Sequence, residues 1–283
     1  MIFLLKRILT GVIGIAVLVP FIIFSENWPL ILLTVLMSAI AMYELLKCTG
    51  MLKKLAVSIP TFAIALEAQL LARLLDTDRY LTVMLLSYMA FTVAMMTVAV
   101  FSKGSIKLSD LAQSVLMTVY VSFGFSSLIL LRDMNEQYGL ILFLLAFLIP
   151  WVCDAMAYFV GVFFGKHKMI PDVSPKKTIE GAVGGIVGTV VITAAFGLTM
   201  HFGFGKQPNY VLLLCLALVG GFVSQWGDLI ASLLKREYGV KDYGSIFPGH
   251  GGVMDRFDSL FSVSVFIYIV CRLFESYPLF ISW

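Results

Sequence analysis

The sequence predicts an all-α, polytopic integral membrane protein, a bundle of about nine transmembrane helices. The 283 residues are 60% hydrophobic and only 13% charged, with a mean hydropathy of +0.97, which is outside the range of a soluble domain. The apolar residues fall into runs near the ~20 residues that a helix needs to cross hydrocarbon. Hydrocarbon offers the backbone no hydrogen-bond partners, and the runs lack the alternation of barrel strands, so the spans should be helices.

Short polar connections separate the apolar runs. The runs are 8–24, 29–45, 55–75, 80–101, 108–131, 139–164, 181–202, 210–234 and 257–274. The first is longer than a signal-peptide core and lacks a small-residue cleavage site, so we interpret it as an uncleaved helix. We divide the chain into N-terminal helices at 1–135, a scaffold and candidate oligomer interface, and a catalytic region at 136–283 with cytoplasmic loops at 165–180 and 237–256.

The distribution of basic residues predicts the orientation. Fifteen of the 20 Lys and Arg residues fall on the side of the N-terminus and five on the other. The positive-inside rule places the N-terminus in the cytoplasm, and an odd number of spans places the C-terminus outside. The basic inner face favours membrane lipids with anionic headgroups and anionic solutes, and we expect no nucleic-acid partner.

The first cytoplasmic loop contains the sequence SPKKT at 174–178. Ser174 suits an N-cap and the proline suits the first helical position, with Lys176, Lys177 and Thr178 beside them. Exposed N–H groups at a helix start and adjacent ammonium groups predict a site for an anion such as a triphosphate. The alternative is a capped helix whose lysines face anionic headgroups.

Asp154 lies inside the preceding apolar run, toward its cytoplasmic end. An ionisable residue at that depth is a candidate for function, because an unpaired buried carboxylate is unfavourable. The glycines at 181, 184, 185 and 188 are instead typical of helix packing.

The second loop brings further carboxylates to the same membrane depth. Asp228, Ser232 and Lys235 share one face of a helix, and Asp255 and Asp258 lie three positions apart where the next helix begins. Carboxylates in this number suit Mg²⁺, with Mn²⁺ as the alternative.

Between these acids, PGHGG at 248–252 contains Gly251 and Gly252, which allow the backbone to approach a phosphate closely. His250 is interpreted as a hydrogen-bond donor. The bases that can neutralise phosphate charge are Lys235, Arg236, Lys241 and Arg256. The alternative is that these acids and bases only neutralise one another in ion pairs.

These residues carry a family resemblance. The segment SLLKREYGVKDYGSIFPGHGGVMDRFDS at 232–259 resembles the C-terminal signature of the phosphatidate cytidylyltransferases, or CDP-diacylglycerol synthases. The stretches DAMAYFVGVFFGKHKM and SPKKTIEG are similar to that family's other shared block. The resemblance covers about 154–259, and the first half of the chain matches only as apolar spans. Val162 departs from the pattern, since an arginine or lysine is common there.

The resemblance implies transfer of a cytidylyl group from CTP to phosphatidic acid, which gives CDP-diacylglycerol and pyrophosphate and requires a divalent metal. On this interpretation the catalytic residues are Asp228, Asp255, Lys235, Arg256 and His250. The substrate-binding residues are Ser174, Lys176, Lys177, Thr178, Ser232, Arg236, Lys241, Gly251 and Gly252. The metal ligands are Asp228, Asp255, Asp258 and Asp154. We expect the protein in the bacterial inner membrane with its site facing the cytoplasm, and the resemblance leaves open a second metal ion and a homodimer.

Two other functions compete with this interpretation. A CTP-dependent polyprenol kinase would also place acids and lysines at the cytoplasmic surface. A secondary transporter would use an acid within the bundle, such as Glu67, but the other intramembrane acids lie toward one face rather than at the midplane. We therefore expect Glu67 to be paired locally within the bundle. A CDP-alcohol phosphotransferase is disfavoured because its DGxxAR motif is missing.

Overall fold

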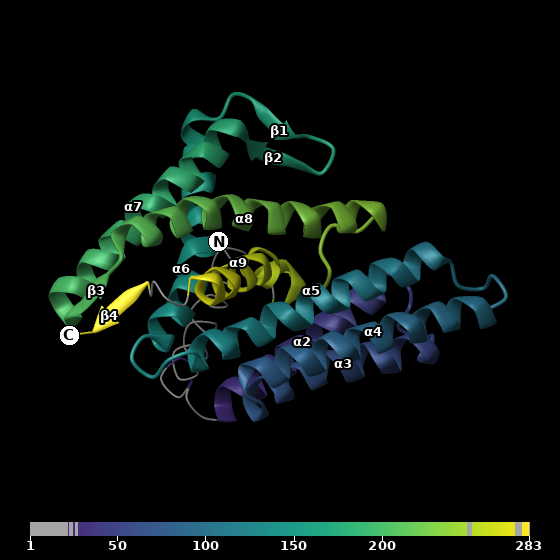
Figure 1. The fold of residues 1–283 in the computed structure, drawn as a ribbon. Coiled ribbons are helices and arrows are strands. Elements are labelled where there is room, and N and C mark those ends of the chain that lie inside the picture. The colour runs from purple at the N-terminus through teal and green to yellow at the C-terminus, as the bar shows by residue number, and fades with distance from the viewer. Residues whose placement is uncertain (1–21, 23–24, 26–27, 248–250, 275–278, 283) are drawn as a thin grey trace. The chain divides into compact units, whose positions relative to one another are not determined.

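The computed structural model describes residues 22, 25, 28–247, 251–274 and 279–282 (Figure 1). Most of them lie in helices. These are α2 (Trp28–Cys48), α3 (Leu55–Leu74), α4 (Thr77–Phe101), α5 (Leu108–Asp133), α6 (Gly139–Phe164), α7 (Ile179–Phe204), α8 (Tyr210–Glu237) and α9 (Met254–Leu273). Four short strands accompany them: β1 (Lys168–Ile170), β2 (Ser174–Thr178), β3 (Lys206–Pro208) and β4 (Phe280–Ser282).

The prediction of an all-α membrane protein is confirmed. Within the described residues, α2 to α8 are each long and apolar enough to cross a membrane. Helix α9 corresponds to the last predicted run, but four of its 20 residues are charged. The run predicted at 8–24 lies outside the described residues apart from residue 22. The count of nine spans and the sides of the two termini therefore stay predictions.

The chain packs as two compact units. The first contains Met1–Asp133 and Glu237–Phe257, and the second contains Met134–Arg236 and Asp258–Trp283. The first unit thus includes the loop predicted at 237–256 together with the N-terminal helices. Whether catalysis belongs to 136–283 and a scaffold role to 1–135 stays a prediction.

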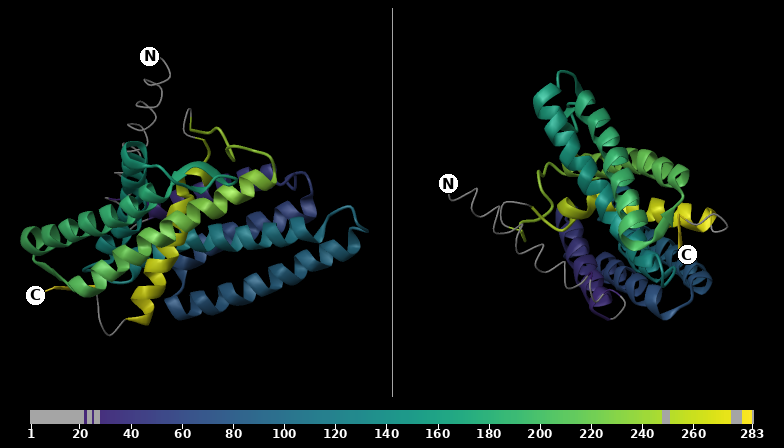
Figure 2. Two further views of the ribbon diagram at one scale, coloured as in Figure 1. Left: turned by 90° about the horizontal axis from the view of Figure 1, so that it is seen from above. Right: turned by 90° about the vertical axis from the view of Figure 1, so that its left-hand side faces the viewer.

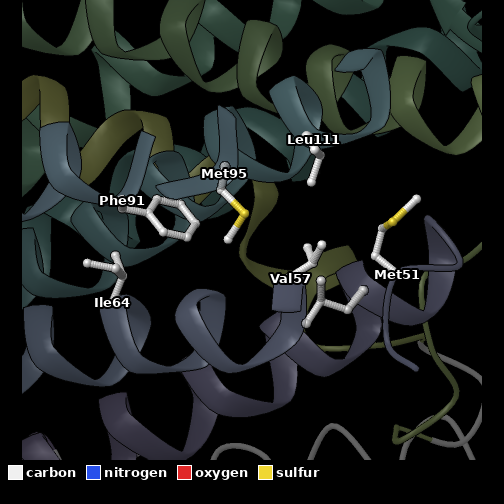
Figure 3. Packing of buried hydrophobic residues seen from close by; sticks show 7 residues of the cluster. Met51, Val57, Ile64, Phe91, Met95 and Leu111 are labelled. Atoms are coloured by element: carbon white, nitrogen blue, oxygen red, sulfur yellow. The ribbon is translucent and has the colours of Figure 1, made fainter. Parts of the chain in front are cut away.

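In the first unit, α3 packs against α2, α4 and α5. Its apolar core includes a cluster of seven buried side chains: Leu46, Met51, Val57, Ile64, Phe91, Met95 and Leu111. Figure 3 labels all of them except Leu46. Helix α4 begins at an N-cap, because the side chain of Asp76 accepts a hydrogen bond from the backbone N–H of Arg79.

Hydrogen bonds between polar side chains link the helices of the first unit. Tyr80 on α4 donates to Ser126 Oγ on α5 at 2.6 Å. Glu67 on α3 accepts a hydrogen bond from Ser87 on α4 at 2.9 Å, which confirms the expected local partner of this acid. Such pairs between neighbouring spans satisfy groups that hydrocarbon cannot.

In the second unit, glycines let α6 and α7 approach each other closely. A methyl group at Gly181 would lie 2.7 Å from the backbone oxygen of Ala157, and one at Gly185 would lie 2.8 Å from that of Cys153. Larger residues would separate the helices, so the predicted packing role of these glycines is confirmed. Helix α7 ends at Phe204, and Gly205 caps it with a φ of 64°, a conformation that glycine adopts without strain.

Two strand pairs mark the two ends of α7. Strands β1 and β2 are antiparallel and directly precede the helix. Strand β3 follows it and pairs with β4, near the C-terminus (Figure 2). An apolar groove between α8 and α9 is lined by residues such as Leu212, Leu216, Val219 and Phe266, and it contains none of the predicted site residues.

Candidate active site

A lysine and an aspartate from different elements meet in the second unit. The Nζ of Lys177, on β2, lies 2.7 Å from Oδ2 of Asp228, on α8. One turn further along α8, Ser232 donates a hydrogen bond to Oδ1 of Asp228 at 3.2 Å. Both oxygens of this carboxylate therefore have a partner. The predicted shared face of Asp228 and Ser232 is confirmed.

The local sequence explains how β2 presents Lys177. The backbone of β2 pairs with β1, so Lys168 lies opposite Thr178. Alternate residues of a strand point to opposite sides. Lys177 accordingly is half-buried against α8, whereas Lys176 is exposed.

The predicted helix start at Ser174 is wrong. Residues 174–178 form strand β2, and α7 begins at Ile179 with Thr178 as its N-cap. The hydroxyl oxygen of Thr178 accepts a hydrogen bond from the backbone N–H of Gly181 at 3.1 Å. Pairing with β1 holds Ser174 in extended backbone, so the cap passes to the threonine at the end of the strand. Lys176 and Lys177 therefore lie on a strand before the helix rather than in its first turn.

A second group of polar residues joins α6 and α9. Ser259 donates its backbone N–H to Oδ1 of Asp258 at 2.8 Å. Its hydroxyl donates to Oδ2 of Asp154, on α6, at 3.4 Å. Through Ser259, the carboxylates of Asp154 and Asp258 are joined. Both were predicted as metal ligands.

The two polar groups of the second unit interact electrostatically. Asp228, Lys235 and Asp154 all exert their charge on Asp258. Helices α8 and α9 are in close contact here, because a methyl group at Gly227 would lie 2.8 Å from the backbone oxygen of Asp258. Asp154, Asp228 and Asp258, from α6, α8 and α9, therefore share one neighbourhood with Lys235. The predicted inclusion of Asp255 in the same group stays a prediction.

Burial divides this site into an inner and an outer part. Lys235 and Asp258 are 8% and 7% exposed, whereas the side chains of Lys177 and Asp228 are 24% and 28% exposed. Buried charges persist only when they are paired. A solute can therefore reach the Lys177–Asp228 pair, whereas Lys235 and Asp258 are largely shielded from solvent.

Gln225 was missed by the sequence analysis. Its side-chain Nε2 donates to the backbone oxygen of Ala182 at 2.8 Å, which ties α8 to the first turn of α7. Its own backbone oxygen accepts a hydrogen bond from Lys177 Nζ at 3.4 Å. A buried amide one turn before Asp228 was the available signal, because polar side chains within apolar spans usually join helices.

The first unit holds Asp255, and its carboxylate organises the second loop. Its Oδ2 accepts hydrogen bonds from the backbone N–H groups of Tyr243, at 2.8 Å, and Gly252, at 2.9 Å. Asp255 is 7% exposed. Joint binding of a metal by Asp228 and Asp255 stays a prediction. At the start of this loop, the hydroxyl of Tyr238 donates a hydrogen bond to Gln113 on α5. Burial, and next the charge of Asp110, raises the pKa of Tyr238 to about 12.

Glu44 is a second residue that the sequence analysis missed. Its carboxylate on α2 accepts hydrogen bonds from the backbone N–H groups of Val253, at 3.1 Å, and Met254, at 2.9 Å. The signal was present, because Glu44 is an acid inside an apolar run. Its partners lie 209 and 210 residues away, which no local pattern reveals.

Most of the remaining predicted site residues are exposed, and one lies outside the residues that the structure describes. Arg236 is exposed, and its Nε donates to the backbone oxygen of Val173 at 3.2 Å. Lys241 and Arg256 are exposed. Gly251 adopts a φ of +85°, as glycine can without strain. His250 lies outside the described residues.

Carboxylate oxygens are the donors that this site offers to a divalent cation. Among the described residues, no three His, Cys, Asp or Glu side chains are arranged so that they could hold a metal ion by themselves. Mg²⁺ does not require this, because it commonly uses one or two carboxylates together with water and substrate phosphates. The oxygens of Asp228, Asp154 and Asp258 fit that chemistry.

Comparison with known proteins decides the family. A family model described as "Cytidylyltransferase family" matches residues 5–274. The chain belongs to this family. It is 35% identical to the phosphatidate cytidylyltransferase of Bacillus subtilis (strain 168), over 95% of this chain and 98% of that protein. It is 36% identical to the phosphatidate cytidylyltransferase of Staphylococcus epidermidis (strain ATCC 12228) and 34% identical to that of Staphylococcus haemolyticus (strain JCSC1435), in both cases over 91% of this chain and 95% of the relative.

Proposed function

We propose that this protein is a phosphatidate cytidylyltransferase, which transfers the cytidylyl group of CTP to phosphatidate. Family membership and relatives of this name over nearly the whole chain support the activity. The main structural support for placing the active site here is the ion pair of Lys177 and Asp228, which are 2.7 Å apart, in the same unit as the buried Lys235 and Asp258. A basic and acidic site on membrane helices suits a reaction between a nucleotide and a lipid phosphate.

The reaction exchanges one phosphoanhydride bond for another. An oxygen of the phosphatidate phosphate attacks the α-phosphorus of CTP, the bond from that phosphorus to the bridging oxygen breaks, and pyrophosphate leaves. A phosphate monoester has a second pKa of about 6, so the nucleophile is already ionised near neutral pH and needs no strong base. Alignment and neutralisation of charge should supply most of the catalysis.

Lys177 and Lys235 supply that neutralisation. Lysine acts as a compact point charge with a flexible stem, so Lys177 can turn from Asp228 to a phosphate oxygen. Lys235 is nearly buried, where its charge is less screened by water. We assign Lys177 to the nucleotide phosphates and Lys235 to the charge that develops on the departing pyrophosphate. Lys176, Arg236 and Lys241 are exposed and give weaker support to the same anions.

We propose Mg²⁺ as the cofactor, with Asp228 as the principal ligand and Asp154 and Asp258 as supporting groups. The cation would neutralise phosphate charge and orient the triphosphate. Asp228 suits this role because its partners are a lysine and a serine side chain, both able to move. Asp255 is kept as a proposed ligand, and a second ion is left open.

We further propose that the site faces the cytoplasm of the bacterial inner membrane. The excess of Lys and Arg on one side of the spans supports this orientation. CTP would then enter from the cytoplasm, and phosphatidate would arrive from the inner leaflet.

The decisive experiment uses the purified protein with labelled CTP, phosphatidate and Mg²⁺. We expect label in a lipid product and release of pyrophosphate in equal amounts. Release of CDP with phosphorylation of a polyprenol would instead identify a kinase. The absence of lipid labelling under conditions where the protein is folded would refute the proposal.

A further inference from the structure

Glu44 fixes the first turn of α9 from the opposite end of the sequence. Each of its two carboxylate oxygens accepts one backbone N–H, from Val253 at 3.1 Å and from Met254 at 2.9 Å. The first N–H groups of a helix have no partner within the helix, and a side chain normally satisfies them from nearby in the sequence. Here α2 provides that partner, and Glu44 is only 3% exposed.

The loop before α9 is shaped around this carboxylate. A methyl group at Gly244 or at Gly252 would overlap the oxygens of Glu44. Neither glycine has a positive φ, so glycine is required at these positions by space rather than by backbone conformation. Two glycines of the loop thus lie against the Glu44 carboxylate, and two backbone N–H groups donate to it.

Glu44 and Asp255 divide the loop's donors between them. Asp255 accepts the N–H groups of Tyr243 and Gly252, and Glu44 accepts the next two along the chain. The chain's own carboxylates therefore occupy the start of α9, and the N–H groups of Val253 and Met254 are not available to a phosphate. The direction of Asp255 depends on a turn that Glu44 holds in place.

We propose that Glu44 is a positioning residue for cytidylyl transfer, which sets the first turn of α9 and with it the carboxylate of Asp255. This inference rests on the proposed function. The positioning role predicts that substitution of Glu44 alters the chemical step and the metal requirement rather than the binding of CTP alone.

The test compares Glu44→Gln with Glu67→Gln. Both replace an acid on a helix of the first unit by its isosteric amide. Glu44 is buried and Glu67 is half-buried. Glu67 accepts its hydrogen bond from the side chain of Ser87, whereas Glu44 accepts from the backbone of the loop. In Glu44→Gln one N–H keeps the amide oxygen and the other faces an NH₂ group, which cannot accept it. We expect kcat to fall at least about tenfold, equivalent to about 1.4 kcal/mol, and the Mg²⁺ concentration for half-maximal activity to rise. Glu67→Gln should change either value by less than about twofold, because the amide oxygen can keep the hydrogen bond from Ser87.

Gly244→Ala provides an independent variant, because its methyl group would displace the same carboxylate without changing any charge. It should reproduce the kinetic pattern of Glu44→Gln. Amide hydrogen exchange of residues 251–257, measured on the same proteins, should be faster in both variants than in the wild type and unchanged in Glu67→Gln. This readout does not depend on catalysis.

The outcomes separate the two proposals. If the wild-type protein forms no CDP-diacylglycerol, the proposed function fails, whatever the exchange data show. Wild-type activity together with an unchanged kcat in Glu44→Gln overturns the positioning role. The same conclusion follows if exchange at 251–257 is unaltered. It also follows if Glu67→Gln loses as much activity and thermal stability as Glu44→Gln, since the loss would then reflect only removal of an acid from a helix of the first unit.

Discussion

Replacing Lys177 with alanine should impair the use of CTP while the protein stays folded. In the structure, Lys177 Nζ lies 2.7 Å from Asp228 Oδ2 and 3.4 Å from the backbone oxygen of Gln225. The proposed mechanism transfers this ammonium group to a nucleotide phosphate. A hydrogen bond to a charged group contributes about 1.5–3 kcal/mol when it is shielded from water.

The exposure of the pair sets the expected magnitude. The two side chains are 24% and 28% exposed, so water and salt screen part of the interaction. We therefore take the lower end of the range, about 1.5 kcal/mol, which corresponds to roughly a tenfold fall in kcat/KM for CTP. For stability, loss of a partly exposed ion pair should amount to about 1 kcal/mol or less.

Steady-state assays with varied CTP and saturating phosphatidate measure this effect, and Lys168→Ala serves as the control. Lys168 lies on β1, opposite Thr178 in the strand register, and is exposed. Its removal deletes the same charge from the same hairpin and should change kcat/KM by less than about twofold, because an exposed charge is largely screened. Equal effects of the two substitutions would show that the hairpin contributes only general positive charge. An unchanged kcat/KM in Lys177→Ala would refute the assigned role of this lysine.

Four other predictions concern the same unit. Asp228→Asn should lower kcat by at least about a hundredfold with little loss of folded protein, because the amide cannot replace a charged ligand. Chelation of divalent cations should abolish wild-type turnover, and added Mg²⁺ should restore it. Full activity of Asp228→Asn would remove this residue as a metal ligand, and turnover after chelation would remove the metal from the mechanism. Thr178→Ala should lower the free energy of unfolding in detergent by about 1 kcal/mol through loss of the α7 N-cap, and an unaltered value would show that pairing with β1 holds the helix start alone. Gly181→Ala should destabilise the protein by about 1–3 kcal/mol, because its methyl group would meet Ala157 and Gly161 on α6. Gly203→Ala should leave stability unchanged, because no atom lies within 4 Å of the added methyl group. Similar losses of stability in both variants would contradict the packing argument.

The membrane helices could be predicted because their signal is local. Length and apolarity decide whether a run can span, and each described helix corresponds to a predicted run. The start of α7 could not be placed in the same way. SPKKT contains two acceptable caps, Ser174 and Thr178, and a proline that suits a helix start. The choice depends on the pairing of Lys168 with Thr178 across the turn, which is a property of two segments rather than one.

Site residues could be predicted from the sequence where charged residues occur within or beside apolar runs. Asp154 was identified because a carboxylate in an apolar span is unfavourable without a partner, and Asp228 and Asp258 because their spacing places them on one helix face with other polar residues. Glu44 and Gln225 obey the same rule and were overlooked, because neither belongs to a recognisable motif. Their partners are backbone groups of distant segments. Motif spacing reveals groups that share a helix or loop, whereas contacts across the sequence appear only with the fold.

Glu44 and Asp228 show how one type of side chain serves two purposes. Both are acids on membrane helices, and both carboxylate oxygens of each have partners. The partners of Glu44 are backbone N–H groups that move only if the loop moves, and the side chain is 3% exposed. Those of Asp228 are a lysine and a serine side chain, which can change rotamer, and 28% of its side chain is exposed. A cation can therefore replace the partners of Asp228 without disturbing the backbone, whereas ligation by Glu44 would dismantle the start of α9. The mobility of its partners, more than the presence of a carboxylate, makes Asp228 the better candidate to bind the metal.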